Sequence, residues 1–346
     1  MIGYYVHHQG VGHRERMLAI AAEMAVPLTV LSSLPRPAAG PSWVHLPGDD
    51  SGQDFLEPTA NGTWHWVPLH HPGLRTRMAL IAEWIARAQP ALLVVDVSVE
   101  VAGLARLLGV PTVLLAMRGD RSDRPHVTAY DSAHALIAPW APEFGPSWWP
   151  RSWTDKTFHA GPITAPAGGR PIRPAVHEPR RILVLWGAGG DEASTTGFGS
   201  ARVGALREAH PQWDWRFAGG TGEHRVDRAE VDRLLGWADV VITHAGQNAV
   251  AEVAAARTPA VVIADARPHG EQNDTAMTLA GAGIAVGLPG WPAVDDWPQL
   301  LDRALALGGA QWSRWLTPHG AQRAAAFLAE TAERLRPALP PPAAAS

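Results

Sequence analysis

Short apolar runs alternate with helical patterns along most of the chain. In the first half, apolar runs predict strands at residues 2–6, 28–31, 91–95, 112–116 and 135–138. Helical patterns lie between them, at residues 14–24, 75–88 and 99–108. Buried strands that alternate with helices are typical of a parallel α/β sheet. We therefore expect a Rossmann-like domain in this half.

The pattern stops near residue 161 and starts again near residue 181. Prolines and the Gly168-Gly169 pair crowd the stretch between, which is the composition of a linker. Further strands are predicted at residues 181–186, 213–217, 240–243, 260–263 and 284–286. Further helices are predicted at residues 202–209, 248–256, 272–280, 298–307 and 322–336. The second half is thus a second Rossmann-like unit.

The chain of 346 residues is about twice the length of a typical domain, which agrees with two units. The predicted parts are an N-terminal domain, a linker, a C-terminal domain, helices that pack back and a disordered tail, at residues 1–162, 163–178, 179–310, 311–336 and 337–346. Ligands of such domains bind beyond the carboxyl ends of the strands. The loops that follow residues 6, 95, 186, 243 and 263 are therefore where we look for a site.

Composition removes several classes of function. The net charge of −4 gives no basic surface for nucleic acid. Cysteine is absent and the one lysine, Lys156, is not in a Gly-Lys-Ser/Thr motif, which excludes thiolate chemistry and a P-loop. No run of about 18 apolar residues could span a membrane, and no secretion signal opens the sequence. We expect a cytoplasmic protein without an integral membrane segment.

The most informative turn follows the strand predicted at 240–243 and holds His244, Gly246, Gln247 and Asn248. A helix begins there, and its free backbone N–H groups and dipole favour an anion. Gly246 allows a phosphate to approach the backbone. The side chains of His244 and Asn248 can donate hydrogen bonds to diphosphate oxygens. For Asn248 the plain alternative is a helix cap.

Carboxylates and amides follow at spacings that suit a sugar. Glu252 lies one helical turn after Asn248, where it can bind a ribose diol. Glu271 and Gln272 end the next loop, and together they can accept from and donate to several hydroxyls. A solvated loop is the plain alternative for this pair. The combination of phosphate, ribose and polyol binding predicts a nucleotide-sugar site.

The loop after the first strand carries candidate bases. A hydroxyl that attacks a sugar must lose its proton, and a histidine supported by a carboxylate is suited to take it. His13 follows a glycine-containing turn, and Asp96 ends a strand at the same predicted crevice. His7 and His8 are competing candidates. No further ligands accompany these histidines in a motif, so we expect no metal.

At this point the sequence resembles a known family. Residues 237–252 with Glu271-Gln272 resemble the donor-binding half of GT-B glycosyltransferases, especially MurG-type enzymes, which use UDP-GlcNAc, and UDP-glycosyltransferases with a His-x-Gly-x-Asn-x-x-x-Glu signature. The resemblance implies a GT-B fold, in which two Rossmann-like domains face each other across a cleft. It implies diphosphate contacts from His244, Gly246, Gln247 and Asn248. It also implies a ribose contact from Glu252 and donor-sugar contacts from Glu271 and Gln272.

The N-terminal loop is similar to the acceptor loop of the same family, which implies that His13 is the base and Asp96 its partner. Glycine-rich loops of the family face the donor diphosphate, and the matching residues here are Gly12, Gly187 and Gly189. Retaining relatives commonly have Glu-x7-Glu where this chain has His244 and Glu252, which favours inversion. MurG-type enzymes have Gln-Gln in place of Glu271-Gln272, so the resemblance does not imply the donor sugar.

The resulting hypothesis is an inverting glycosyltransferase that moves a sugar from a UDP-sugar or dTDP-sugar to a hydroxyl. The acceptor is a small molecule, a lipid-linked molecule or a glycan, and no cofactor is expected besides the donor. Because Asp-x-Asp is absent, the helix N-terminus and His244 replace a cation at the leaving group. The alternatives are an epimerase of the UDP-GlcNAc 2-epimerase type and a non-catalytic nucleotide-sugar-binding partner subunit.

Two other segments carry weaker expectations. Three tryptophans at residues 148, 149 and 153 are expected to pack near the domain boundary, with peripheral membrane contact left open. The charged run at residues 118–124 is expected to be a solvated loop.

Overall fold

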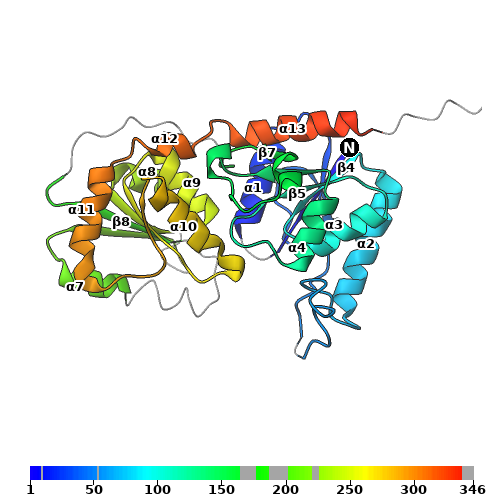
Figure 1. The fold of residues 1–346 in the computed structure, drawn as a ribbon, viewed down its shortest axis with the longest axis horizontal. Coiled ribbons are helices and arrows are strands. Elements are labelled where there is room, and N and C mark those ends of the chain that lie inside the picture. Colours follow the sequence, from blue (N-terminus) through cyan, green and yellow to red (C-terminus); the bar gives the residue numbers. More distant parts are fainter. Residues whose placement is uncertain (9–10, 53, 164–176, 187–201, 220–225, 337–346) are drawn as a thin grey trace, which may run out of the picture.

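The computed structural model describes residues 1–8, 11–52, 54–163, 177–186, 202–219 and 226–336, and these form two domains (Figure 1). Each domain has one sheet, and every strand pairing described is parallel. The strand orders are β3-β2-β1-β4-β5-β6-β7 and β12-β11-β10-β8-β9. The predicted α/β class with two Rossmann-like domains is confirmed.

The strands of the N-terminal sheet are β1 (Ile2–Val6), β2 (Leu28–Ser32), β3 (Ser42–His45), β4 (Leu92–Asp96), β5 (Thr112–Leu115), β6 (Ala135–Ala138) and β7 (Thr157–His159). Its helices are α1 (Val11–Ala22), α2 (Pro72–Ala88), α3 (Val99–Leu107), α4 (Arg124–Ser132), the short α5 (Arg151–Thr154) and the 3₁₀ turn η1 (Pro142–Phe144). The central strands β1 and β4 are buried along their whole length, as strands covered on both faces must be.

The strands of the C-terminal sheet are β8 (Arg181–Trp186), β9 (Asp214–Gly219), β10 (Val240–His244), β11 (Ala260–Ile263) and β12 (Val286–Leu288). Its helices are α7 (Val203–Ala209), α8 (Arg228–Trp237), α9 (Gln247–Ala256), α10 (Glu271–Gly281) and α11 (Trp297–Leu307), with 3₁₀ turns η4 (Pro268–Gly270) and η5 (Val294–Asp296). The strand predicted at 284–286 was placed two residues too early, because buried Ile284 and Ala285 extend the apolar run ahead of the strand.

The last helices return to the N-terminal domain. After α12 (Trp312–Trp315), the helix α13 (Gly320–Arg334) packs along α1 (Figure 1). Ala324, Ala325 and Leu328 of α13 are buried in the same cluster as Met17 and Ile20 of α1. The tail at 337–346 and most of the linker at 163–178 lie outside the described residues. No helix in the described part of the chain is long and apolar enough to cross a bilayer.

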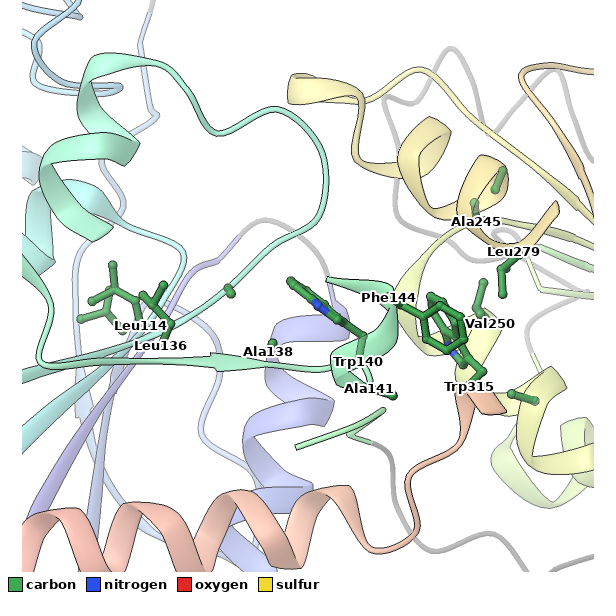
Figure 2. Close-up of a cluster of buried hydrophobic side chains, with 14 of the residues drawn as sticks. Leu114, Leu136, Ala138, Trp140, Ala141, Phe144, Ala245, Val250, Leu279 and Trp315 are labelled. Carbon is green, nitrogen blue, oxygen red and sulfur yellow. The ribbon is translucent and has the colours of Figure 1, made fainter. Parts of the chain in front are cut away.

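A buried cluster joins the two domains beside Arg118, which follows β5. The Nη2 atom of Arg118 donates to Oγ1 of Thr278 at 2.7 Å, and its Nε atom lies 2.8 Å from a carboxylate oxygen of Asp274. Figure 2 shows Trp140 and Phe144 from the N-terminal domain close to Trp315. Arg118 is only 2% exposed and lies over both tryptophan rings.

The expectation of a solvated loop at 118–124 is therefore wrong for two of its three arginines, since Arg118 and Arg121 are buried whereas Arg124 is exposed. The tryptophan segment packs largely as expected. Trp149 and Trp153 are buried against Tyr130, whereas Trp148 is 44% exposed.

Candidate active site

His13 and Asp96 meet at the carboxyl end of the N-terminal sheet. The register of β1 and β4 pairs Val6 with Asp96, and the first turn of α1 carries His13 over this point. Nδ1 of His13 lies 2.9 Å from Oδ1 of Asp96, which is fully buried. A carboxylate only accepts, so in the tautomer that carries its proton on Nδ1 the ring donates to Asp96 and leaves Nε2 to accept a proton.

Arg16 is a buried member of this site that the sequence reasoning did not identify. Its Nε donates to Oδ2 of Asp96 at 3.1 Å, and its Nη2 donates to Oδ1 at 2.5 Å. The Nη2 atom also lies 2.9 Å from Nδ1 of His13, so the three groups form one compact cluster. The spacing of Arg16 three residues after His13, on the same helix face, is the signal that could have found it.

Neighbouring groups stabilise the ionised form of Asp96. Burial alone would raise the pKa of Asp96, but the charges and hydrogen bonds of Arg16 and His13 lower that pKa well below its ordinary value. Asp96 is therefore ionised at neutral pH and can stabilise a protonated His13. The cap of α3 is Ser98, so Asp96 has no capping role there.

The competing histidines have different partners. His8 lies 2.9 Å from a carboxylate oxygen of Asp50, and the ring of His7 stacks on that of His8 at 4.6 Å. Burial and the neighbouring His8 lower the pKa of His7 to about 3, far below the range in which a base is effective at neutral pH. The ring of His13, in contrast, lies at hydrogen-bond distance from the carboxylate of Asp96.

The turn after β10 ends in an uncapped helix N-terminus. Gly246 is the N-cap of α9 and has no side chain that could accept a hydrogen bond, so the cap residue leaves the first N–H groups of α9 available to another acceptor. Gln247 and Asn248 lie in the first turn, which excludes the cap role for Asn248. A Cβ atom on Gly12 would lie 3.2 Å from Nδ2 of Asn248, so the N-termini of α1 and α9 lie close together.

A hydrogen bond connects the helix N-terminus with the cluster around Asp96. Nη1 of Arg16 donates to Oε1 of Gln247, and Nε2 of Gln247 lies 3.8 Å from the sulfur of Met117. Because these residues come from different domains, this bond fixes where the turn of α9 sits relative to His13.

His244 is a neutral donor in this turn. Burial and the charge of Arg267 lower the pKa of His244 to about 4, so the ring is uncharged at neutral pH. The Gly246 N–H donates to Nδ1 of His244 at 3.0 Å, which leaves the ring proton on Nε2. His244 therefore offers an N–H donor beside the helix N-terminus.

The three remaining predicted residues, Glu252, Glu271 and Gln272, lie in different surroundings. Glu252 is half-buried on α9, one turn after Asn248. Glu271 lines the cavity, where burial raises its pKa, and Arg121 lies 3.8 Å away. Gln272 is buried and its Oε1 accepts from the N–H of Asp265 at 3.0 Å. The structure thus separates the expected pair, because Gln272 holds the loop after β11.

A cavity of about 410 Å³ lies between the domains, within the range of small-molecule sites. Residues of both domains line it, among them His13, Arg121 and Glu271. Arg121 is a buried cation that the sequence reasoning missed, and within the described residues its Nε has no hydrogen-bond partner. Gly187 and Gly189 lie outside the described residues.

Comparison with known proteins agrees with this architecture. Residues 228–290 match the glycosyltransferase family 28 C-terminal domain. The glycotransferase of kitacinnamycin is similar in structure, with 15% identity, a TM-score of 0.64 and coverage of 97% of this chain and 99% of that chain. The chain has the GT-B fold. The resemblance to GT-B glycosyltransferases noted from the sequence is confirmed.

Two further GT-B structures are similar over nearly the whole chain. MurG of Acinetobacter baumannii has 14% identity and a TM-score of 0.60, with coverage of 95% of this chain and 99% of that chain. A UDP-glucosyltransferase from Polygonum tinctorium has 14% identity and a TM-score of 0.63, with coverage of 96% and 98%. No curated protein matches the sequence.

Gly246 of the GT-B cleft provides a first prediction. A Cβ atom there would lie 2.3 Å from Cε1 of His244, so we expect Gly246→Ala to displace the His244 ring. Such overpacking costs about 1–3 kcal/mol, which urea unfolding measures. Gly204→Ala is the matched control, because its Cβ meets no described atom within 4 Å. Equal stability of Gly246→Ala and the unaltered protein would contradict this prediction.

Proposed function

We propose that this protein is an inverting, metal-independent glycosyltransferase that moves a sugar from a UDP-sugar or dTDP-sugar to an acceptor hydroxyl. The observation that carries the proposal is the hydrogen bond from Arg16 to Gln247. It joins the His13–Asp96 pair to the N-terminus of α9, and thus a base to an anion site. The family 28 match over residues 228–290 supports a nucleotide-sugar donor there.

In the proposed reaction His13 acts as the general base. Nε2 of His13 takes the proton of the acceptor hydroxyl while the hydroxyl oxygen bonds to the anomeric carbon. The bond from that carbon to the diphosphate oxygen breaks, and attack from the opposite face inverts the configuration. Asp96 stays ionised and stabilises the imidazolium that forms.

The leaving diphosphate gains negative charge, which the turn of α9 is arranged to stabilise. The backbone N–H groups at the start of α9 and Nε2–H of His244 supply fixed donors, with Asn248 as an additional one. These donors do the work of a metal cation, so the proposal requires no metal at the diphosphate. Glu252 binds the ribose, and Glu271 binds hydroxyls of the donor sugar in the cavity. A small-molecule, lipid-linked or glycan acceptor enters from the side of His13.

Titration calorimetry tests the donor site. UDP, dTDP, GDP and UDP-GlcNAc are titrated in EDTA against the unaltered protein and Glu252→Ala. We expect UDP or dTDP to bind saturably and Glu252→Ala to weaken binding about 10–100-fold, the equivalent of a lost charged hydrogen bond. Glu208→Ala, an exposed glutamate on α7, is the matched control.

Absence of binding by all four ligands, or equal affinities of the unaltered protein and Glu252→Ala, would refute the donor site.

A second experiment distinguishes transfer from epimerisation. UDP-GlcNAc is incubated with the protein alone and followed by NMR, and we expect no UDP-ManNAc. Formation of UDP-ManNAc would make the protein an epimerase.

A further inference from the structure

Three histidines and one aspartate converge at the edge of the cavity, outside the proposed diphosphate site. Asp123 caps α4 and His126 lies in its first turn, while His65 comes from the loop between β3 and α2. His269 comes from η4 of the C-terminal domain. All three histidines line the cavity between the domains.

The four side chains are close enough to share one ligand. Nε2 of His65 lies 2.9 Å from Oδ1 of Asp123, and Nδ1 of His126 lies 2.6 Å from Oδ2. Nδ1 of His269 lies 3.4 Å from the same Oδ2 atom. The four potential ligand atoms all lie within 4.8 Å of one another.

This geometry is near that of a tetrahedral zinc site. With zinc bonds of about 2.0–2.1 Å, the ligand atoms of a tetrahedron are about 3.3 Å apart. The contact between His269 and Asp123 has nearly that length, at 3.4 Å. The contacts of His65 and His126 with Asp123, at 2.9 and 2.6 Å, must lengthen by less than about 1 Å. A pair of ligand atoms at the upper limit of 4.8 Å must approach by about 1.5 Å. Three imidazole nitrogens and one carboxylate oxygen are a donor set that Zn²⁺ prefers.

The charges nearby also suit a cation. Asp120, Asp123 and Glu271 each carry one negative charge when ionised, against one positive charge each on Arg121 and Arg267. Arg121 lies on the far side of the His126 ring, with Nη1 3.5 Å from Nε2, so Nδ1 is the nitrogen turned toward Asp123. A cation among these groups therefore meets a net negative charge.

A second acidic cluster is less suitable. His8, Asp49 and Asp50 also lie within reach of one another, but they include a single imidazole. Asp49 is already paired with Arg77 at 3.3 Å. This cluster serves as a comparison in the experiment below.

We propose that the protein has a divalent-metal site, best matched to Zn²⁺, formed by His65, Asp123, His126 and His269. Its ligands come from both domains, so the metal connects the two domains across the cavity and stabilises the arrangement of the domains described above. A backbone hydrogen bond between the domains positions His269, the ligand from the C-terminal domain: the N–H of Asp120 donates to the carbonyl of His269 at 2.8 Å. None of its four ligands belongs to the turn before α9, and sugar transfer as proposed above requires no metal.

Calorimetry with zinc chloride tests this site. The full chain is stripped with a chelator, which is then removed, and titrated with Zn²⁺ alone. We expect one site per chain, with affinity at least tenfold weaker in His65→Ala and in His269→Asn. Asparagine is chosen because His269 has a φ of 62°, which asparagine tolerates. His45→Ala, an exposed histidine on β3, is the matched control and should bind as the unaltered protein does.

Thermal unfolding tests the bridge between domains. Zn²⁺ should raise the Tm of the unaltered protein more than that of His269→Asn, because a ligand that binds only the folded state stabilises it according to its affinity. Circular dichroism without metal confirms that each variant is folded. The proposal is overturned if Zn²⁺ does not bind saturably, if His269→Asn binds Zn²⁺ as tightly as the unaltered protein, or if His8→Ala weakens binding instead.

Discussion

Replacement of His13 by alanine is expected to lower kcat by about 10²–10⁴-fold, the usual contribution of a general base. The affinity for the nucleotide sugar should change little, because the diphosphate donors belong to the turn of α9. The measurement compares kcat from product formation with the donor affinity from calorimetry. Added imidazole should restore part of the rate in His13→Ala, since it can occupy the space of the missing ring.

An exposed histidine provides the control for this experiment. His134 lies between α4 and β6 at the surface, and His134→Ala should leave kcat unchanged. If His13→Ala retained full activity while His7→Ala or His8→Ala lost it, another histidine of the same loop would be the base.

Replacement of Arg16 by methionine is expected to destabilise the protein by about 3–5 kcal/mol, because it leaves the buried carboxylate of Asp96 without its cation. Urea unfolding monitored by tryptophan fluorescence measures this loss. Arg14→Met is the matched control on the same helix. Arg14 pairs with Glu15 at the surface, so its loss should cost at most about 1 kcal/mol.

The double variant Arg16→Met with Asp96→Asn separates stability from catalysis. Removal of the carboxylate charge should recover much of the lost stability, whereas activity should stay low because His13 has lost its charged partner. A single Arg16→Met variant as stable as the unaltered protein would show that Asp96 does not depend on this cation.

The lowered pKa of Asp96 also gives the direction in which the stability of the protein changes with pH. Its contribution to stability is present at neutral pH and is lost as the pH falls below the ordinary aspartate pKa of 3.8.

Burial determined which elements the sequence could predict. Strands such as β4 and β10 are covered on both faces and appear as continuous apolar runs. The edge strand β3 was missed, since its four residues are only half-buried or exposed. The helices α4 and α8 were missed as well, because polar residues fill much of their sequence.

Some contacts of the candidate site could likewise be predicted from the sequence, whereas others could not. His13 and Asp96 could be paired from the sequence because Asp96 ends β4 and His13 follows β1, its neighbour in the sheet. The contact between Arg16 and Gln247 joins residues that are 231 positions apart and lie in different domains, so it could not be predicted from a local sequence pattern. The four proposed zinc ligands come from separate loops and a helix start, so only the folded chain brings them together. The catalytic and donor-binding roles of the predicted residues stay predictions.

The return of α13 to the N-terminal domain means that the chain passes between the domains twice, once after β7 and once before α13. The C-terminal domain is therefore an insertion within the N-terminal one. A domain attached at two points cannot swivel freely about a single tether, so the double connection leaves the α9 turn and His13 fewer relative orientations than a single connection would.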